Sequence, residues 1–284
     1  MSVILARYSE IGLKSTPVRV RFENRLRDNI ISMLASDRIE ALVTKKDARF
    51  FIESERIDDA ASSVKRVFGI SSLSIAEVCT SDMSDICSTA AEYSMGRLRS
   101  GDSFAVKARR EGSHPYTSMD VGREAGSAIF IANESKGVKV NLTDPDVVFY
   151  VEVRNNKAYI FESYVKCHGG LPIGTQGKVM AEIKSDRDIL SAWLMMKRGC
   201  KLIISGGKQP LLERYDPELR YGSEISQEVL GLVRGITLSE LESVTVMPSE
   251  APLFFPTIGM SDEEVSSLLD SIKKEAAPSG GTGQ

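Results

Sequence analysis

The chain has 284 residues and a mass of 31.1 kDa, which suits two or three domains of roughly 100–150 residues each. Hydrophobic residues make up 42% and charged residues 26%, proportions that exclude a disordered chain, a collagen-like repeat and a coiled coil. The formal net charge is −3, so any binding of nucleic acid must come from a local cationic patch.

The composition also argues against a membrane protein and against a protein held together by metal ions or disulfides. No run approaches the roughly 20 apolar residues of a membrane span and no signal-peptide pattern is present, so we expect a cytoplasmic protein without a membrane partner. The four cysteines form no CxxC pair, and there are only two histidines. These are too few ligands for a zinc site or a disulfide framework, and we predict no metal site.

The first 77 residues predict a ferredoxin-like domain. After Thr16 and Pro17, a pair that marks a helix start, apolar residues recur every three or four positions. The expected strands cover 3–8, 40–45, 49–53 and 71–76, and the expected helices cover 17–35 and 57–68. This order of elements is typical of a four-stranded antiparallel sheet with two helices on one face.

Residues 78–165 predict a second domain of the α/β type. Its expected helices cover 82–98 and 120–133, and its expected strands cover 103–108, 138–142, 147–153 and 157–163. Asp120 is the expected cap of the second helix, and a polar loop is expected over 109–118. The strand–helix–strand crossover implies a partly parallel sheet.

A glycine-rich linker, 166–178, leads to a third predicted domain over 179–277. Strands are expected over 179–183, 201–205 and 244–247, and helices over 188–198, 224–233 and 262–274. This alternation is typical of a small doubly wound sheet, so the fold class is α/β with an α+β first domain. Residues 278–284 are expected to form a disordered tail.

Two cationic segments are candidates for contact with RNA. The helix from Pro17 carries Arg19, Arg21, Arg25 and Arg27, either as a phosphate-binding ridge or as a solvated face, and the residues alone favour the solvated face. Segment 104–118 has the cations and aromatic rings that suit single-stranded RNA, or else it is a charged surface loop. Its candidate residues are Lys107, Arg109, Arg110, His114 and Tyr116.

Several stretches resemble the tRNA sulfurtransferase family called ThiI, which makes 4-thiouridine. RYSEIGLKS with RVRFENRL is similar to the opening of that family, and FAVKARREGSHPYTSMDVGREAGSAI is similar to its RNA-binding THUMP domain. DPDVVFYVEVRNNKAYIF resembles the closing strands of that domain. GGLPIGTQGKV and AWLMMKRG resemble the segments that flank the family's nucleotide-binding loop, so the resemblance covers residues 1–200.

The resemblance implies that the first two domains bind tRNA. The matching positions in the ferredoxin-like domain are Arg7, Lys14, Arg19 and Arg25. The THUMP surface would present Lys107, Arg109 and Arg110 to the acceptor end of the tRNA.

The chain departs from the family at the nucleotide-binding loop. Where active members carry SGGxDS, this chain reads IKSDRDILSAW, and both glycines are missing. Side chains there restrict positive φ and fill the space of a phosphate, and Asp186 adds negative charge. Arg187 is the cation that could compensate. The vestigial loop consists of Lys184, Ser185, Asp186, Arg187 and Asp188, and no cysteine follows Cys200 to carry the family's persulfide.

We therefore expect a tRNA-binding THUMP protein of tRNA modification and thiouridine biosynthesis, with a degenerate PP-loop domain, no catalytic residue and no cofactor. It would present tRNA to a separate sulfurtransferase or modifying enzyme. The alternative is an active ATP-dependent tRNA sulfurtransferase, for 4-thiouridine or the thiamine thiazole, with a divergent site at 184–188 or at the turn 205–207. A third hypothesis is a scaffold whose remnant domain forms a homodimer.

Overall fold

The computed structural model describes residues 2–223, 227–243 and 251–277. The described chain divides into two compact units. One consists of Met1–Leu5, Phe51–Glu53 and Leu73–Val165, and the other consists of Ala6–Phe50, Ser54–Ser72 and Lys166–Gln284. The domain bounds 1–77, 78–165 and 179–277 stay predictions, because the division into units cuts across the first of these ranges.

The first 166 residues follow the predicted order of elements. The strands are β1 Ser2–Arg7, β2 Leu42–Lys46, β3 Arg49–Glu53, β4 Ser72–Thr80, β5 Ser103–Glu111, β6 Lys139–Val140, β7 Val147–Arg154, β8 Lys157–Phe161 and β9 Val165–Lys166. The helices are α1 Thr16–Ser36, α2 Ile57–Lys65, α3 Met83–Met95 and α4 Ser118–Ala132, with the 3-10 turns η1 Glu10–Leu13 and η2 Glu134–Lys136. The strand order β2-β3-β1-β4 is that of a ferredoxin-like domain, as the sequence predicts.

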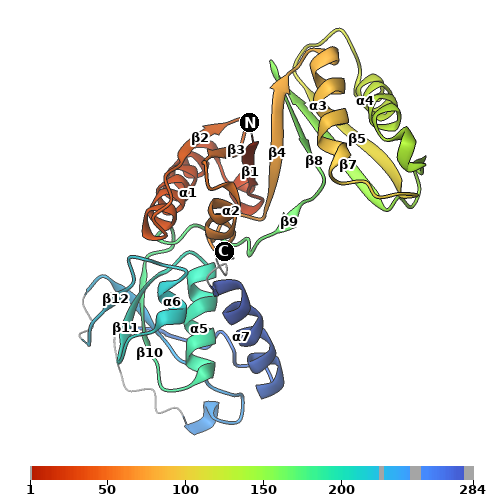
Figure 1. Cartoon of the computed structure of the whole chain (residues 1–284). Coiled ribbons are helices and arrows are strands. Elements are labelled where there is room, and N and C mark those ends of the chain that lie inside the picture. Colours follow the sequence, from red (N-terminus) through yellow and green to blue (C-terminus); the bar gives the residue numbers. More distant parts are fainter. Residues whose placement is uncertain (1, 224–226, 244–250, 278–284) are drawn as a thin grey trace. The chain divides into compact units, whose positions relative to one another are not determined.

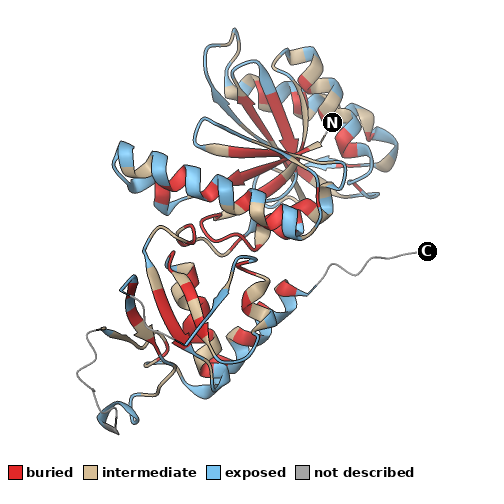
Figure 2. Ribbon diagram, turned by 90° about the vertical axis from the view of Figure 1, so that its left-hand side faces the viewer, coloured by how far each residue is buried: buried red, intermediate tan, exposed pale blue. Residues whose placement is uncertain are grey.

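In the first unit, the sheet β4-β8-β7-β5-β6 packs one face on α3 and α4 (Figure 1). β5 and β7 run parallel whereas β7 and β8 run antiparallel, which confirms the partly parallel sheet. The opposite face carries a second apolar cluster, in which Tyr159 and Phe161 pack with Val3, Leu5 and Phe51. Figure 2 shows the buried residues gathered in the strands, while the helices alternate between buried and exposed patches.

The structure corrects the bounds of the polar loop and the helix caps. β5 continues to Glu111, because every position from Phe104 to Glu111 pairs with β7, so Arg109 and Arg110 lie on a strand and not in a loop. The cap of α4 is Thr117, and Asp120 completes a capping box with it.

The second unit contains α1, α2 and a parallel sheet of five strands. These are β10 Lys178–Glu182, β11 Lys201–Ser205, β12 Arg220–Tyr221, β13 Val229–Val233 and β14 Leu253–Phe254, with helices α5 Asp186–Lys197, α6 Pro210–Glu213 and α7 Asp262–Ala276 and the 3-10 turn η3 Leu241–Ser243. The strand order is β12-β11-β10-β13-β14, and each pairing is parallel. Such an order reverses direction between β10 and β13, and doubly wound sheets bind their ligands at this point.

The predicted helix over 224–233 is wrong, because Val229–Val233 is strand β13. Its side chains alternate between buried and less buried positions, which is the period of a strand. A Cβ on Gly231 would lie 2.3 Å from the Phe254 ring, so the glycine allows β13 and β14 to approach. The predicted strand 244–247, the tail 278–284 and residues 224–226 lie outside the described residues.

Within the described residues, every helix is too short or too polar to cross a lipid bilayer.

Candidate nucleic-acid interface

The cations of β5 are exposed and point to both faces of the sheet. Because side chains alternate along a strand, Lys107 and Arg109 share the face opposite α3 and α4, whereas Arg110 lies on the face that these helices cover. On β7, Lys107 has Tyr150 as its register partner and Arg109 has Glu152. The three predicted RNA contacts therefore lie on one strand but do not form a single patch.

His114 and Tyr116 make contacts inside their own domain. Their rings stack with centroids 5.4 Å apart, and the Tyr116 hydroxyl donates to the carbonyl oxygen of Ser81. His114 Nε2 lies 2.5 Å from the carbonyl oxygen of Asn155, and burial raises the pKa of Tyr116. These contacts fix the loop after β5, and the stacking of either ring on RNA stays a prediction.

An apolar groove with a volume of about 730 Å³ lies between α4 and the strands β5 and β6. Gly122 and Gly126 bring α4 close to β5, since a Cβ on either would lie 3.7–3.9 Å from Val106. Arg123 is the cation among its lining residues. Its volume is in the range of small-molecule pockets, so it has room for a nucleotide-sized group.

The predicted cations of the ferredoxin-like domain differ in exposure. Arg7 is only 9% exposed, because it lies on β1 within the sheet, and it is no part of an exposed ridge. Lys14 is exposed after η1, and Arg19 is half-buried on α1. Arg25 is exposed, and its side chain lies next to Gly174. A Cβ added to Gly174 would lie 3.4 Å from Arg25 Nε. The α1 cations thus face different neighbours.

Glu23 is a buried residue of α1 to which the sequence analysis assigned no role. Its carboxylate accepts the hydroxyl of Tyr8 and lies 2.7 Å from Nζ of Lys45. The helical period could have indicated it, because Glu23 precedes the buried Leu26 and Ile30 by three and seven residues.

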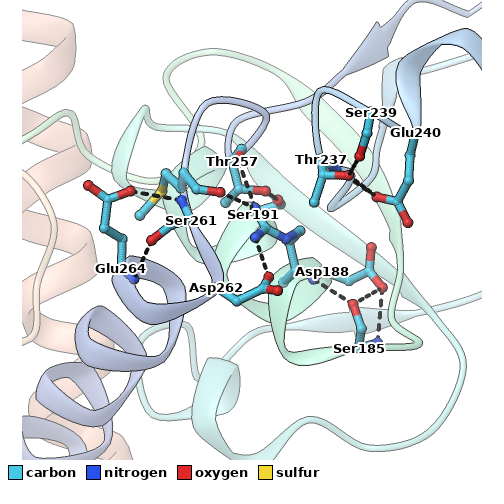
Figure 3. A network of polar contacts seen from close by, with 12 residues as sticks. Ser185, Asp188, Ser191, Thr237, Ser239, Glu240, Thr257, Ser261, Asp262 and Glu264 are labelled. Atoms are coloured by element: carbon cyan, nitrogen blue, oxygen red, sulfur yellow. Dashed lines mark hydrogen bonds and ion pairs between the residues drawn. The ribbon is translucent and has the colours of Figure 1, made fainter.

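The loop after β10, residues 184–188, is filled by a carboxylate of its own chain (Figure 3). Asp188 Oδ2 accepts the backbone N–H of Lys184 at 3.1 Å, the N–H of Ser185 at 3.0 Å and the Ser185 hydroxyl at 2.8 Å. Asp188 Oδ1 accepts the N–H of Gly235 at 2.7 Å. Backbone amides at such a helix start are the donors that a phosphate requires. The pattern Ser-x-x-Asp is that of a capping box, which could have indicated this arrangement from sequence.

The segment after β13 closes the same crevice. A Cβ on Gly235 would lie 2.4 Å from the carbonyl carbon of Arg187, so this segment touches the first turn of α5 through backbone atoms. The contact lies between β10 and β13, where the strand order reverses and a nucleotide would bind. The residues present therefore do not fit the ATP that the family resemblance implies.

Arg187 does not compensate for the missing glycines. It is buried, and its guanidinium donates to the carbonyl oxygens of Thr257 at 2.9 Å and Met260 at 3.0 Å and pairs with Asp262 at 2.6 Å. These partners tie it to the segment that leads into α7. The exposed residues of the loop form ion pairs, Lys184 with Glu182 at 2.9 Å and Asp186 with Lys273 at 3.9 Å.

Two family models match the chain. The family model described as the ThiI ferredoxin-like domain matches residues 3–74, and that described as the THUMP domain matches residues 80–161. The chain is 43% identical over 202 residues to the "Probable tRNA sulfurtransferase" of Methanosarcina acetivorans, covering 70% of this chain and 49% of that protein. It is 33% identical over 281 residues to the protein of the same name from Methanocaldococcus jannaschii, covering 96% and 68%. The chain thus spans about half the length of the first relative.

Two solved structures share the fold. The crystal structure of PH1313 from Pyrococcus horikoshii Ot3 has a TM-score of 0.81 and 25% identity, and the match covers 96% of this chain and 100% of that one. The crystal structure of a 4-thiouridine synthetase–RNA complex with bound ATP has a TM-score of 0.74 and 21% identity, and the match covers 97% and 86%. The RNA and the ATP are those of that protein, and the likeness to it concerns the fold.

Proposed function

Because the chain belongs to the tRNA sulfurtransferase family, we propose that it binds tRNA through its ferredoxin-like and THUMP domains and does so without using ATP. In this proposal it acts in tRNA modification as a binding protein. It presents the tRNA to a separate sulfurtransferase or modifying enzyme, which supplies the chemistry.

The observation that carries the proposal is the position of the Asp188 carboxylate. It accepts the amide hydrogens of Lys184, Ser185 and Gly235, which would otherwise bind the phosphates of ATP. An anion entering this site would have to displace a carboxylate that is covalently part of the chain and already in place. The Asp188 carboxylate therefore favours loss of ATP binding, and it does not involve the surfaces that we propose for RNA.

In this proposal the tRNA contacts charged side chains of β5, and part of it enters the groove between α4 and the strands β5 and β6. Lys107 and Arg109 are exposed on the face opposite α3 and α4, where they can reach phosphates. The groove between α4 and β5, with Arg123 in its lining, has room for an unpaired nucleotide.

A binding titration against salt tests the RNA half of the proposal. We expect the chain to bind tRNA at low salt, with an affinity that falls as salt rises. The double variant Lys107→Ala, Arg109→Ala should lower the slope of log affinity against log salt by roughly 2, about 1 for each lost phosphate contact. Lys274→Ala on α7 is the control, because it removes an exposed charge from the other unit and should leave the slope unchanged. Failure of the intact chain to bind tRNA would end the proposal.

Calorimetry with ATP and magnesium tests the other half. We expect no heat of binding at millimolar nucleotide, with or without tRNA. Saturable heat would instead support the alternative of an active ATP-dependent tRNA sulfurtransferase. Sedimentation of the same samples would address the scaffold hypothesis, since a monomer at all concentrations would argue against a homodimer.

A further inference from the structure

Glu23 is a buried carboxylate that joins three elements of the ferredoxin-like domain. Its side chain is only 7% exposed, on α1. It accepts the hydroxyl of Tyr8, directly after β1, and pairs with Lys45 on β2 at 2.7 Å. Burial opposes the charge of Glu23, but the hydrogen bonds from Lys45 and Tyr8 outweigh it, so the pKa of Glu23 lies below its ordinary value. The group is therefore an ionised anchor.

Tyr8 connects Glu23 to the turn that contains Lys14. The Tyr8 ring meets Phe50 edge to face, with centroids 6.3 Å apart, and its hydroxyl bonds to Glu23. Three residues later, Ile11 is fully buried, and its carbonyl oxygen accepts the N–H of Lys14 at 3.1 Å. The contacts of Tyr8 and the burial of Ile11 therefore fix this turn ahead of Lys14.

Lys45 on β2 is the cation that contacts this carboxylate. The positive charge of Arg19 lowers the pKa of Glu23, as does that of Lys45. Without this partner, the long side chain of Lys45 would regain rotamer freedom.

We propose that Glu23 is a positioning residue for tRNA binding, which holds Lys45 by its ion pair and, through Tyr8, the turn that bears Lys14, in one fixed arrangement before a phosphate arrives. The inference rests on the proposed function and adds a residue that itself repels RNA. Ordering these side chains during folding removes an entropic penalty of roughly 1 kcal/mol from binding, which corresponds to about fivefold in affinity.

The charge of Glu23 makes the test decisive, because the two explanations predict opposite signs. If Glu23 affected RNA only through its negative charge, Glu23→Gln would remove that charge and strengthen tRNA binding. A positioning role predicts binding about fivefold weaker and a smaller salt slope, since organised phosphate contacts are lost. Asp28→Asn is the matched control on the same helix, because it makes the same charge change at a carboxylate that is 59% exposed. It should leave binding unchanged or strengthen it.

Tyr8→Phe provides a second variant that changes no charge. It keeps the ring against Phe50 and removes only the bond to Glu23, so we expect weaker tRNA binding in a protein that melts cooperatively. Tighter binding by Glu23→Gln, or unchanged binding by a folded Tyr8→Phe, would overturn the inference while the proposed function stands. Absence of tRNA binding by the intact chain would remove the proposed function itself and the inference with it.

Discussion

Arg66, which follows α2, pairs with Asp37 at the end of α1, and its side chain is only 4% exposed. Arg214, after α6, lies 3.1 Å from the other carboxylate oxygen of Asp37, Oδ1, and the Ser63 hydroxyl donates to Oδ2, the oxygen that pairs with Arg66. One carboxylate therefore links α1, α2 and the segment after α6 within the second unit. A buried arginine in such a place depends on its partner, because its charge is otherwise left without compensation.

Asp37→Asn should therefore lower the free energy of unfolding by about 3 kcal/mol. The variant leaves the Arg66 guanidinium buried next to a neutral amide. Urea unfolding followed by circular dichroism measures the loss. Asp28→Asn, at an exposed ion pair of the same helix, should stay within about 0.5 kcal/mol of the unchanged chain. Equal effects of the two substitutions would contradict the role of Asp37.

His168 predicts a decline of stability in mild acid. Its ring packs against Phe68, Trp193 and Tyr215, and Nε2 lies 2.9 Å from Glu275. Burial lowers the pKa of His168, and the charge of Glu275 opposes this only in part. The unfolded chain binds the proton at a pKa of about 6.5, so this residue stabilises the fold fully above that pH and progressively less below it.

The measurement for His168 is the free energy of unfolding between about pH 5 and pH 8. We expect the unchanged chain to lose stability as the pH falls through the unfolded pKa, and His168→Gln to show a flatter profile. Parallel profiles for the two proteins, or a gain of stability on acidification that depends on His168, would show that the sign is wrong.

Gly235→Ala should destabilise the chain by about 2 kcal/mol. The new methyl group would lie 2.4 Å from a backbone carbon of Arg187, and backbone atoms cannot move aside as a flexible side chain can. Gly207→Ala is the matched control, because open space surrounds its added methyl group. A thermal melt of the three proteins compares them, and a Gly235→Ala protein as stable as the control would argue against a closed crevice.

Asp188→Ala should lower the free energy of unfolding by about 1 kcal/mol, the usual loss for a helix cap. The substitution removes the acceptor of the Lys184, Ser185 and Gly235 amides. Asp186 is exposed and lies two residues before Asp188. The substitution Asp186→Ala should change stability by less than about 0.5 kcal/mol. Urea titration of both variants is the measurement, and a larger loss for Asp186 would refute the assignment.

The helices with a clear apolar period were predictable from sequence. The pattern of α1, α3 and α7 places buried residues every three or four positions, and the structure has all three helices near their predicted bounds. Strand β13 was not predictable in this way, because its short apolar run suits a helix or a strand equally. Its pairing with β10 and its close approach to β14 at Gly231 decide for the strand.

The sequence by itself determined the ferredoxin-like order, the partly parallel strand arrangement of residues 78–165, the family resemblance and the absence of the family's two loop glycines at 184–188. These depend on residue identity and on periods within a single element, which are local properties of the chain. The tertiary structure alone decided that Asp188 also accepts the amide of Gly235, that Gly235 closes onto α5 and that Glu23 anchors Tyr8 and Lys45. Each of these contacts joins residues that are apart in sequence, or depends on where a side chain points, and neither is fixed until the elements have packed.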